Sequence, residues 1–240
     1  MKVLREQTLE ANLDLVKKNL VIMTWGNVSG YDPETGYIAI KASGVKYEEM
    51  NSEHMTVLDM EGRIVEGKYK PSTDTPTHLV LYRAFKDQGI RGIVHTHSQF
   101  ATVWAQSGVD VPCLGTTHGD YFYGDIPVSR PLLAEEIQGE YEKNTGDVIL
   151  ETLETKKTGC RRMSAVLVHS HGPFVWGDSP AEAVEHSLVL EYISKMAYCN
   201  VTMNCSFRDK PIPRIQQELA DKHYNRKFGP GAYYGQASKT

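Results

Sequence analysis

Leucines and a valine at helical spacing open the chain, at positions 4, 9, 13, 15, 16 and 20. Glutamates lie early in this stretch and Lys17 and Lys18 lie late, as the helix dipole favours, so we expect an amphipathic helix there. Short apolar segments bounded by Gly, Asp or Asn follow it, namely TWGNVSG, YIAIKASG, MTVLDMEG and RIVEG. They predict hairpin-like strands, so the first third of the protein is expected to be largely antiparallel.

The rest of the chain alternates between helical and strand-like patterns. Thr75 stands directly before Pro76, the favoured first residue of a helix, so a helix is expected to start near Thr75. GIVHTHS predicts a buried strand, SQFATVWAQSG a helix, and VPCLGTTHGDYFYGDIPV a strand and loop. PLLAEEIQGEYEKN and GDVILETLETKK predict two helices, and SAVLVHSHGPFVWG a strand pair broken at Gly172 and Pro173. SPAEAVEHSLVLEYISKMAYCN predicts a long helix, and a final helix and tail complete the chain.

Neither a linker, a repeat, a low-complexity stretch nor a charge block divides the 240 residues. This pattern favours one α/β domain over residues 1–240, with a central mixed, largely antiparallel sheet between helical layers. The composition, 40% hydrophobic and 23% charged, excludes disorder, collagen and a disulfide scaffold. A chain of this length buries roughly 70 to 75% of the surface that its unfolded form exposes, so any metal site is expected to be chemical rather than structural.

The charge balance argues against nucleic acid or an anionic membrane as partner. Lys and Arg total 26 against 30 for Asp and Glu, a net charge of -4, so an anionic substrate would have to be bound locally. The four cysteines are widely spaced without a CxxC pair, and the charged N-terminus does not resemble a secretory signal. The longest apolar runs are far shorter than the ~18 residues of a membrane-spanning helix. We therefore expect a cytoplasmic protein.

Four of the nine histidines form two H-x-H pairs, His95 with His97 and His169 with His171. Each pair follows an apolar, strand-like run, and residues i and i+2 of a strand project from the same face. Each pair can therefore direct two imidazoles to one point, and neutral imidazole suits Zn²⁺ and similar divalent ions. The two pairs predict a metal site; buried histidines satisfied by hydrogen bonds are the alternative.

A carboxylate would complete such a site, and Asp74 is the favoured one because it lies at the mouth of a predicted helix. Capping that helix is an equally open role, unless Thr75 caps it instead. KASG at 41–44 and STDT at 72–75 supply a lysine, several hydroxyls and a glycine that a ligand can approach closely. Each stretch alone is typical of an ordinary turn, but together they can hold a phosphate.

The spacing leaves the remaining polar candidates open. Asp120 lies among aromatic residues in TTHGDYFYG, and such surroundings shift proton affinity, although an Asp after Gly is also a common turn residue. The isolated histidines are expected to be surface or hydrogen-bonded core residues: His54, His78, His118, His186 and His223.

Several motifs together resemble those of the L-ribulose-5-phosphate 4-epimerases, in the class II (metal-dependent) aldolase and epimerase family. They are TWGNVS, IKASGV, KPSTDTPTH, IVHTHS, GTTHGDYF, VLVHSHGPF and the tail DKHYNRKFGPGAYYGQ, and they span nearly the whole chain. H-x-H alone is unspecific, whereas PSTDTPTH before HTHS, with terminal HYNRK and AYYGQ, is specific. The resemblance implies a class II aldolase-like fold and a homotetrameric ring. In that ring the tail, about residues 221–240, would reach a neighbouring subunit's active site.

The resemblance also implies ligands and binding residues. It implies Zn²⁺, or a divalent ion such as Mn²⁺ or Co²⁺, held by His95, His97 and His171, with Asp74 as a further ligand or close partner. His169 then has no part in the metal site. The phosphate-binding positions correspond to Asn27, Lys41, Ser43, Gly44, Ser72 and Thr73. At the last of these the family often has Ser, and Thr keeps the hydroxyl.

The proton-handling residues follow from the same likeness. Asp120 matches the acid/base of the epimerases, and Tyr234 matches a tyrosine that enters the active site of a neighbouring subunit. His223 and Arg226 would also be supplied across that interface.

The implied reaction interconverts L-ribulose 5-phosphate and D-xylulose 5-phosphate, as in arabinose catabolism. The C4–H of a ketopentose phosphate is not adjacent to the carbonyl, so cleavage between C3 and C4 is easier than deprotonation. The metal serves as a Lewis acid for this retro-aldol step, and the aldehyde then rotates and adds back through its other face. Two proton-handling groups on different sides are needed, which Asp120 and Tyr234 would provide.

Three other functions are alternatives to this one. A sugar-phosphate aldolase of the same family, such as one that cleaves L-fuculose 1-phosphate, shares the metal histidines but releases its fragments, and TTHGDYF with Asp120 favours the epimerase. A zinc hydrolase is disfavoured because HTHSQF lacks the further Asp-His of a metallo-β-lactamase pattern. A non-catalytic scaffold of the adducin kind would be expected to have lost the metal ligands, which are all present here.

Overall fold

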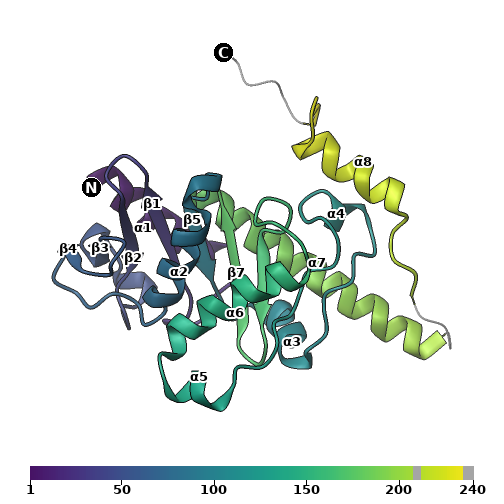
Figure 1. Ribbon diagram of the computed structural model, residues 1–240, viewed down its shortest axis with the longest axis horizontal. Helices are drawn as coiled ribbons and strands as arrows, with labels where there is room; N and C mark the ends of the chain where they lie inside the picture. Colours follow the sequence, from purple (N-terminus) through teal and green to yellow (C-terminus); the bar gives the residue numbers. More distant parts are fainter. Residues whose placement is uncertain (208–211, 235–240) are drawn as a thin grey trace.

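A seven-stranded sheet forms the centre of the protein (Figure 1). This computed structural model describes residues 1–207 and 212–234. The strands lie in the order β4-β3-β2-β1-β5-β7-β6, and every ladder between these neighbours is antiparallel. They are β1 (Asn27–Asp32), β2 (Tyr37–Lys41), β3 (Met55–Leu58), β4 (Ile64–Glu66), β5 (Gly92–His95), β6 (Ala165–Val168) and β7 (Gly172–Gly177). The parallel component of the predicted mixed sheet is an isolated bridge between Val128 and Leu167.

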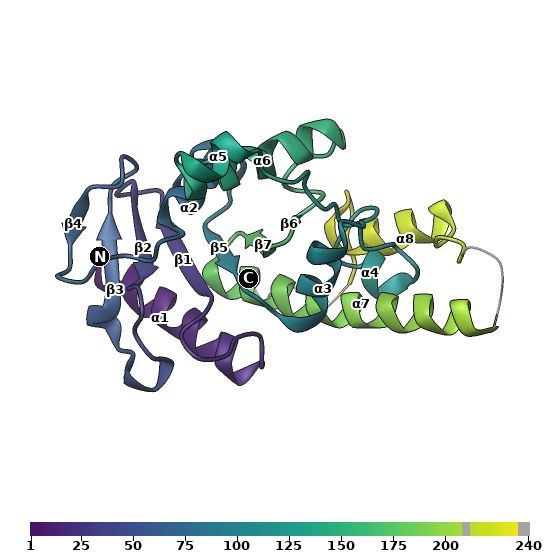
Figure 2. The same cartoon turned by 90° about the horizontal axis from the view of Figure 1, so that it is seen from below.

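Helices cover both faces of the sheet (Figure 2). They are α1 (Lys2–Lys17), α2 (Thr75–Phe85), α3 (Gln99–Ser107), α4 (Thr116–Gly119), α5 (Ala134–Gln138), α6 (Tyr141–Thr155), α7 (Pro180–Phe207) and α8 (Gln217–Phe228). Single 3-10 turns occur at Tyr47–Glu49, Ser52–His54 and Lys86–Gln88. Helices α1 and α7 pack on one face, while α2 and α6 pack together on the other. The predicted α/β domain with a largely antiparallel sheet between helical layers is confirmed.

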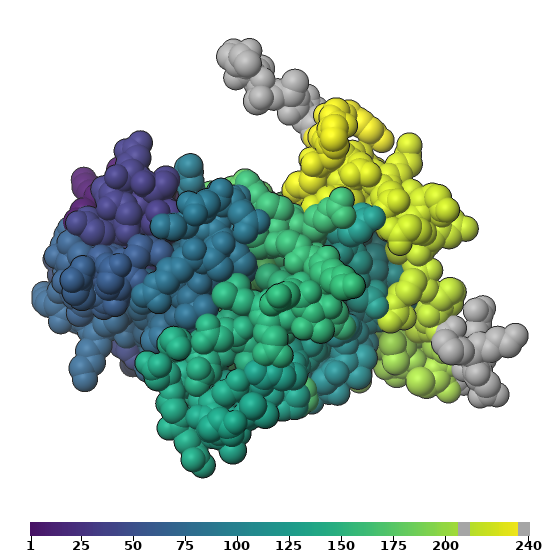
Figure 3. Space-filling view, in the orientation of Figure 1, coloured from purple at the N-terminus to yellow at the C-terminus, as the bar shows by residue number. Residues whose placement is uncertain are grey.

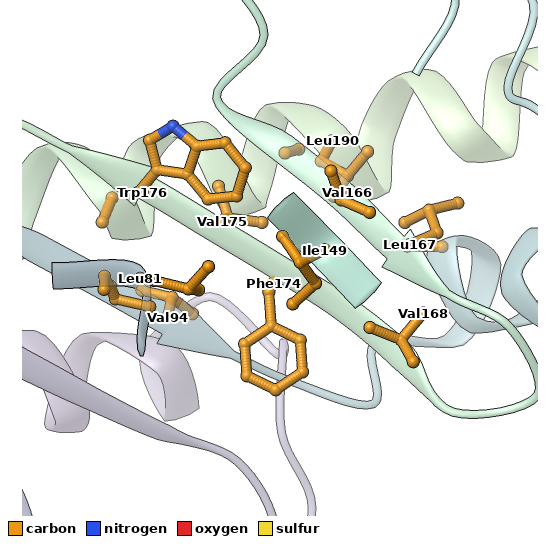
Figure 4. Close-up of a cluster of buried hydrophobic side chains, with 14 of the residues drawn as sticks. Leu81, Val94, Ile149, Val166, Leu167, Val168, Phe174, Val175, Trp176 and Leu190 are labelled. Atoms are coloured by element: carbon orange, nitrogen blue, oxygen red, sulfur yellow. The ribbon is translucent and has the colours of Figure 1, made fainter. Parts of the chain in front are cut away.

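The core lies along the strands β5, β6 and β7, which are buried over their full length. Val94 of β5 and Phe174 of β7 belong to one buried hydrophobic cluster with Leu81 from α2, Ile149 from α6 and Leu190 from α7 (Figure 4). Because helices cover these strands on both faces, each of them is almost continuously apolar instead of alternating. None of the helices in the described residues is both long and apolar enough to cross a membrane.

Two boundaries differ from the sequence-based expectation, and both involve glycines. The two helices expected on either side of residue 145 are a short α5 and a continuous α6 that runs through Gly146. A Cβ at Gly146 would lie 2.7 Å from Cβ of Val80, so this glycine permits close packing between α6 and α2. The strand pair was expected to break at Gly172 and Pro173, but these residues begin β7, and the turn spans residues 169–171 with Ser170 at φ 60°.

Two other elements also differ in extent. The stretch expected to be strand and loop contains the short helix α4, although Val111 and Ile126 do form an antiparallel bridge there. The long helix α7 begins at Pro180, as the Ser-Pro signal predicts, and continues to Phe207, beyond the expected segment.

Candidate active site

One edge of the sheet gathers the predicted site residues, because neighbouring strands run in opposite directions. Strand β1 begins at Asn27, while β2 ends at Lys41 and β5 ends at His95. In the register, Asn27 lies opposite His95, and His95 lies opposite Phe174 near the start of β7. The beginning of one strand therefore lies beside the end of the next. Polar side chains at or next to the ends of four strands, β1, β2, β5 and β7, come together at this edge, where the strands end.

Three imidazoles converge at this edge. One ring nitrogen from each of His95, His97 and His171 lies within 4.8 Å of the others. The Nε2 atoms of His95 and His97 are 3.1 Å apart. Zn–N bonds of about 2.0 to 2.1 Å in a tetrahedral site place two ligand nitrogens about 3.3 Å apart. The arrangement of these donors therefore fits a divalent ion.

Neighbouring groups fix the orientation of these rings. The Nδ1 of His95 lies 3.0 Å from the carbonyl of Pro173 and bonds to it, which leaves Nε2 free to act as a ligand. Phe174 stacks on His95 with ring centroids 4.3 Å apart, and the Tyr141 hydroxyl lies 3.4 Å from Nδ1 of His171. Neither Tyr141 nor Phe174 is predicted to act at the site, because Tyr141 lies outside the motifs and Phe174 is only the apolar end of VLVHSHGPF.

Burial favours the neutral, metal-binding form of the rings. It lowers the pKa of His171 to about 3, with further lowering from the neighbouring His95 and His97. The pKa of His97 is also lowered, by burial first and by His95 second. Because a metal competes with protons for the same nitrogen, rings that stay neutral at ordinary pH are ready ligands.

His169, the fourth histidine of the two pairs, lies apart from the other three. Its Nδ1 bonds to the hydroxyl of Ser170 at 2.8 Å, and it does not line the pocket described below. His169 and His171 both lie in the turn between β6 and β7, so the strand alternation expected to aim them together does not apply. Only His171 reaches the site.

Asp74 occupies the N-cap position of α2, but its side chain does not cap the helix. Instead, Nδ2 of Asn27 donates to Oδ2 of Asp74 at 2.6 Å. Burial alone would raise the pKa of Asp74, but nearby His95 and His78 and the bond from Asn27 hold it below its usual range. The carboxylate is not within the 4.8 Å group of ring nitrogens, so a direct ligand role for Asp74 stays a prediction.

The start of α2 is anchored to β1 by a buried polar network. His78, predicted to be a surface or hydrogen-bonded core residue, is fully buried, and its Nδ1 lies 2.7 Å from Oγ of Ser29. The Tyr82 hydroxyl lies 2.9 Å from the same Oγ. His78 and Tyr82, one turn apart on α2, therefore both bond to Ser29 of β1. This anchoring places Asp74 beside Asn27.

A pocket of about 410 Å³ extends from the histidines past these residues. All six residues that the resemblance assigned to phosphate binding line it. Its lining comprises Thr24, Trp25, Gly26, Asn27, Lys41, Ser43, Gly44, Ser72, Thr73, Asp74, His95, His97 and His171. The structure thus brings together residues from five separate segments of the chain.

Lys41 is the cation of this pocket. It is buried, and its Nζ donates to the carbonyl of Thr24 at 3.1 Å. Burial lowers the pKa of Lys41, and the charge of Asp74 partly offsets this. No carboxylate of the described residues forms an ion pair with it. Because a buried positive charge without a negative counter-charge is unfavourable, Lys41 is suited to receive an anion.

A second polar cluster lies where α8 packs against α4. Arg226 donates hydrogen bonds to both carboxylate oxygens of Asp120, from Nε to Oδ1 at 3.1 Å and from Nη2 to Oδ2 at 2.9 Å. The Nδ1 of His223 lies 2.9 Å from Oδ1 of Asp120. The guanidinium of Arg226 lies 4.8 Å from the centre of the Tyr234 ring. Figure 3 shows this C-terminal segment as a lobe at the end of the molecule opposite β3 and β4.

The cluster is separate from the pocket within one chain. Neither Asp120 nor Tyr234 is among the described residues that line the pocket. Asp120 joins His223 and Arg226 of its own chain, so these residues form one unit. Residues 235–240, which include the end of AYYGQ and of the predicted tail, lie outside the described residues.

The family assignment follows from comparison with known proteins. Residues 6–198 match the family model described as the Class II Aldolase and Adducin N-terminal domain. The chain belongs to this family. The match covers the strands and loops that supply every residue of the pocket, including the three histidines.

Solved structures share the class II aldolase fold. An L-fuculose 1-phosphate aldolase has a TM-score of 0.75 and 22% sequence identity, over 94% of this chain and 96% of that one. L-fuculose-1-phosphate aldolase from Thermus thermophilus has a TM-score of 0.65 and 23% identity, over 85% and 99%. YgbL from Klebsiella pneumoniae, a candidate aldolase/epimerase/decarboxylase, has a TM-score of 0.69 and 21% identity, over 92% and 97%. At these identities the likeness concerns the fold.

Proposed function

We propose that the protein is a metal-dependent L-ribulose-5-phosphate 4-epimerase. The observation that carries this proposal is the convergence of His95, His97 and His171 in a pocket that also presents Lys41 and a row of hydroxyls. Membership of the class II aldolase and adducin family supports carbon–carbon chemistry at such a site. The ordered motifs of the sequence, above all TTHGDYF and the terminal HYNRK, favour the epimerase within that family.

The pocket residues divide into those that hold a metal and those that hold a phosphate. His95, His97 and His171 would bind a divalent ion such as Zn²⁺, with Asp74 as a ligand or close partner. The bound ion would supply Lewis acidity, which stabilises negative charge on a sugar oxygen when the C3–C4 bond opens. Lys41 and the Ser72 hydroxyl would hold the phosphate, with Asn27, Ser43, Gly44 and Thr73 around it.

Phosphate binding also decides which reaction results. After cleavage, the aldehyde fragment must rotate and add back before it leaves, so the phosphate contacts have to retain it. Gly44 supports such contacts, because its backbone has φ 69° and nothing lies within 4 Å of where a Cβ would be. The anion can therefore approach the backbone closely.

Proton transfer would come from the cluster at α8 of a second copy. The C4 hydroxyl lies on opposite sides in the two epimers, so two groups are needed, and we assign them to Asp120 and Tyr234. Because both lie outside the pocket of their own chain, we propose that a neighbouring subunit of a homotetramer brings them to it, together with His223 and Arg226. Tyr234 is exposed and available for such a contact.

A sugar-phosphate aldolase is the second candidate. The similar fold of L-fuculose 1-phosphate aldolase over 94% of this chain favours it, since the same pocket would serve cleavage. The two candidates differ in the fate of the fragments. An aldolase releases them, whereas an epimerase returns a pentose phosphate.

A coupled assay for D-xylulose 5-phosphate from L-ribulose 5-phosphate tests the proposal. We expect product from the metal-loaded protein, none after chelation, and recovery when Zn²⁺, Mn²⁺ or Co²⁺ is restored. Elemental analysis of the same samples is expected to give one ion per chain before chelation. Free glycolaldehyde phosphate without xylulose 5-phosphate would favour the aldolase, and a metal-free, inactive protein would favour a scaffold.

A further inference from the structure

Trp25 is the one large apolar side chain among the described residues that line the pocket. It comes from the TWGNVS motif, and its indole centroid lies 6.0 Å from that of His97, with the rings at 40°. Trp25 is 49% exposed. The other two tryptophans are buried, and their Nε1 groups donate to the carbonyls of Ser194 and Cys160. Trp25 therefore stands at the mouth of the site without the packing that holds the other two.

The backbone around Trp25 is fixed by the pocket itself. The Tyr47 hydroxyl donates to the carbonyls of Trp25 and Gly26 at 3.1 and 3.0 Å, and Lys41 donates to that of Thr24. Gly26 has φ 77°, and a Cβ there would lie 2.6 Å from Val21 and 3.0 Å from the carbonyl of His95. The indole is therefore held beside the histidines by a rigid segment, although its own surface is open.

An open aromatic ring in a polar pocket has a specific chemical use. Sugar fragments present C–H groups as well as hydroxyls, and binding sites combine a few placed polar groups with aromatic surface for the apolar part. The remaining lining of this pocket offers hydroxyls, imidazoles, an amide, an ammonium group and a carboxylate. Trp25 is thus the surface available for the C–H face of a bound sugar.

We propose that Trp25 is a specificity-determining residue that retains the cleaved sugar beside His97. This inference rests on the proposed epimerase function. Cleavage breaks the C3–C4 bond, leaves the electron pair on C3, and turns C4 into an aldehyde as its hydroxyl gives its proton to Asp120 or Tyr234, the groups proposed above for proton transfer. Release of both fragments as stable products requires C3 to take a proton from water, which gives dihydroxyacetone beside free glycolaldehyde phosphate. An indole that lies over the three-carbon fragment shields C3 from water and obstructs the path by which the fragments leave.

The test compares Trp25→Ala and Trp25→Phe with Met23→Ala. Met23 is a matched control, since it lies in the same segment, is 72% exposed and does not line the pocket. We expect Trp25→Ala to lower kcat/KM about ten- to thirtyfold, from lost apolar contact, and to raise the fragments released per xylulose 5-phosphate formed. Trp25→Phe is expected to be intermediate on both measures, and Met23→Ala to match the wild type.

Two results would overturn this role for Trp25. One is a folded, metal-loaded Trp25→Ala protein whose kcat/KM and fragment release match those of Met23→Ala. The other is loss of the metal in Trp25→Ala by elemental analysis, because the ring would then support His97 instead of the sugar.

A fluorescence titration separates this inference from the proposed function. Addition of L-ribulose 5-phosphate to the metal-loaded wild type is expected to change the tryptophan emission, and the change is expected to vanish in Trp25→Phe. An inactive wild type that still shows this Trp25-dependent change would contradict the epimerase but support the sugar contact. An active wild type without the change would contradict the contact alone.

Discussion

The pocket at the sheet edge and the cluster at α8 are held together in different ways. The pocket is set by strand register, since Asn27 and His95 are direct partners between β1 and β5. The cluster is made by side-chain contacts between segments about a hundred residues apart, as in the bond of Asp120 with His223. Backbone pairing leaves the first region little freedom, whereas ion pairs at partly exposed positions contribute little to stability.

This difference fits the two roles proposed for these regions, metal binding in the pocket and proton transfer at the cluster. Metal ligands must be held at fixed distances before any ligand arrives, and a sheet edge provides that. In the proposed function the groups of the cluster serve a neighbouring subunit, so they have to lie on the surface, and the bond of Arg226 with Asp120 holds α8 there. The two regions are therefore expected to fail in different ways when they are altered.

The largest effect is expected when the pocket loses a ligand. His171→Ala removes one of three converging nitrogens, so we expect loss of the bound divalent ion and a fall in kcat/KM of about a thousandfold. Elemental analysis and the epimerase assay measure the two effects. His169→Ala is the control, two residues earlier in the same turn and outside the pocket, and is expected to keep both. Metal retained by His171→Ala would mean that the triad is not the metal site.

A smaller effect is expected at the cluster. Asp120→Asn keeps the shape of the side chain but removes its charge, so we expect kcat to fall about a hundred- to a thousandfold with full metal content. Asp221→Asn is the matched control, since Asp221 lies on α8 and bonds to Tyr123 instead. Loss of metal in Asp120→Asn would assign this carboxylate to the first region and remove the distinction between the two.

A third change affects binding more than chemistry. Lys41→Met fills the buried space with an uncharged chain, so we expect KM for the sugar phosphate to rise about ten- to a hundredfold, from loss of a charged hydrogen bond. Inhibition by inorganic phosphate is expected to weaken in parallel. Lys46→Met, at an exposed lysine paired with Glu49, is expected to alter neither quantity. An unchanged phosphate affinity in Lys41→Met would contradict the anion-binding role.

The smallest effect is expected for the stability of the chain when the cluster is altered. Arg226→Gln should leave the urea midpoint near that of the wild type, since this ion pair is partly exposed.

By contrast, Gly146→Ala should lower the free energy of unfolding by about 1 to 3 kcal/mol, because its Cβ would clash with Val80.

Gly159→Ala is the control for the glycine, since nothing lies within 4 Å of a Cβ built there. A loss of stability in Arg226→Gln as large as that in Gly146→Ala would contradict the expectation that the cluster contributes little to the stability of the fold.

The fold was largely predictable because apolar periodicity follows burial. The early strands, the helix that starts at Thr75 and the long α7 all follow from it. Two of the differences lie at glycines, at residue 146 within α6 and at residue 172 at the start of β7. Gly146 and Gly172 are required by close approach, the former to Val80 and the latter to the carbonyl of Thr96 at 2.7 Å. Sequence spacing cannot tell a glycine that ends an element from one that lets two elements touch.

The candidate site was predictable in its residue types and less so in its geometry. The H-x-H pairs pointed to the three histidines that converge, but the alternation argument was wrong for His169 and His171, which lie in a turn. The bond between Asp120 and His223 spans 103 positions, and the contact of Tyr141 with His171 spans 30. Tertiary packing alone creates such contacts, so no local pattern in the sequence predicts them.

The absence of a side chain at Gly146 has a consequence beyond the packing of α6 against α2. Helix α6 begins at Tyr141, which touches His171, and α2 begins directly after Asp74. The close packing of α2 and α6 therefore helps to position the residues at their N-terminal ends, Asp74 in the pocket and Tyr141 beside His171. A bulkier residue at position 146 is expected to move these two N-terminal ends apart, although residue 146 touches no residue that lines the pocket.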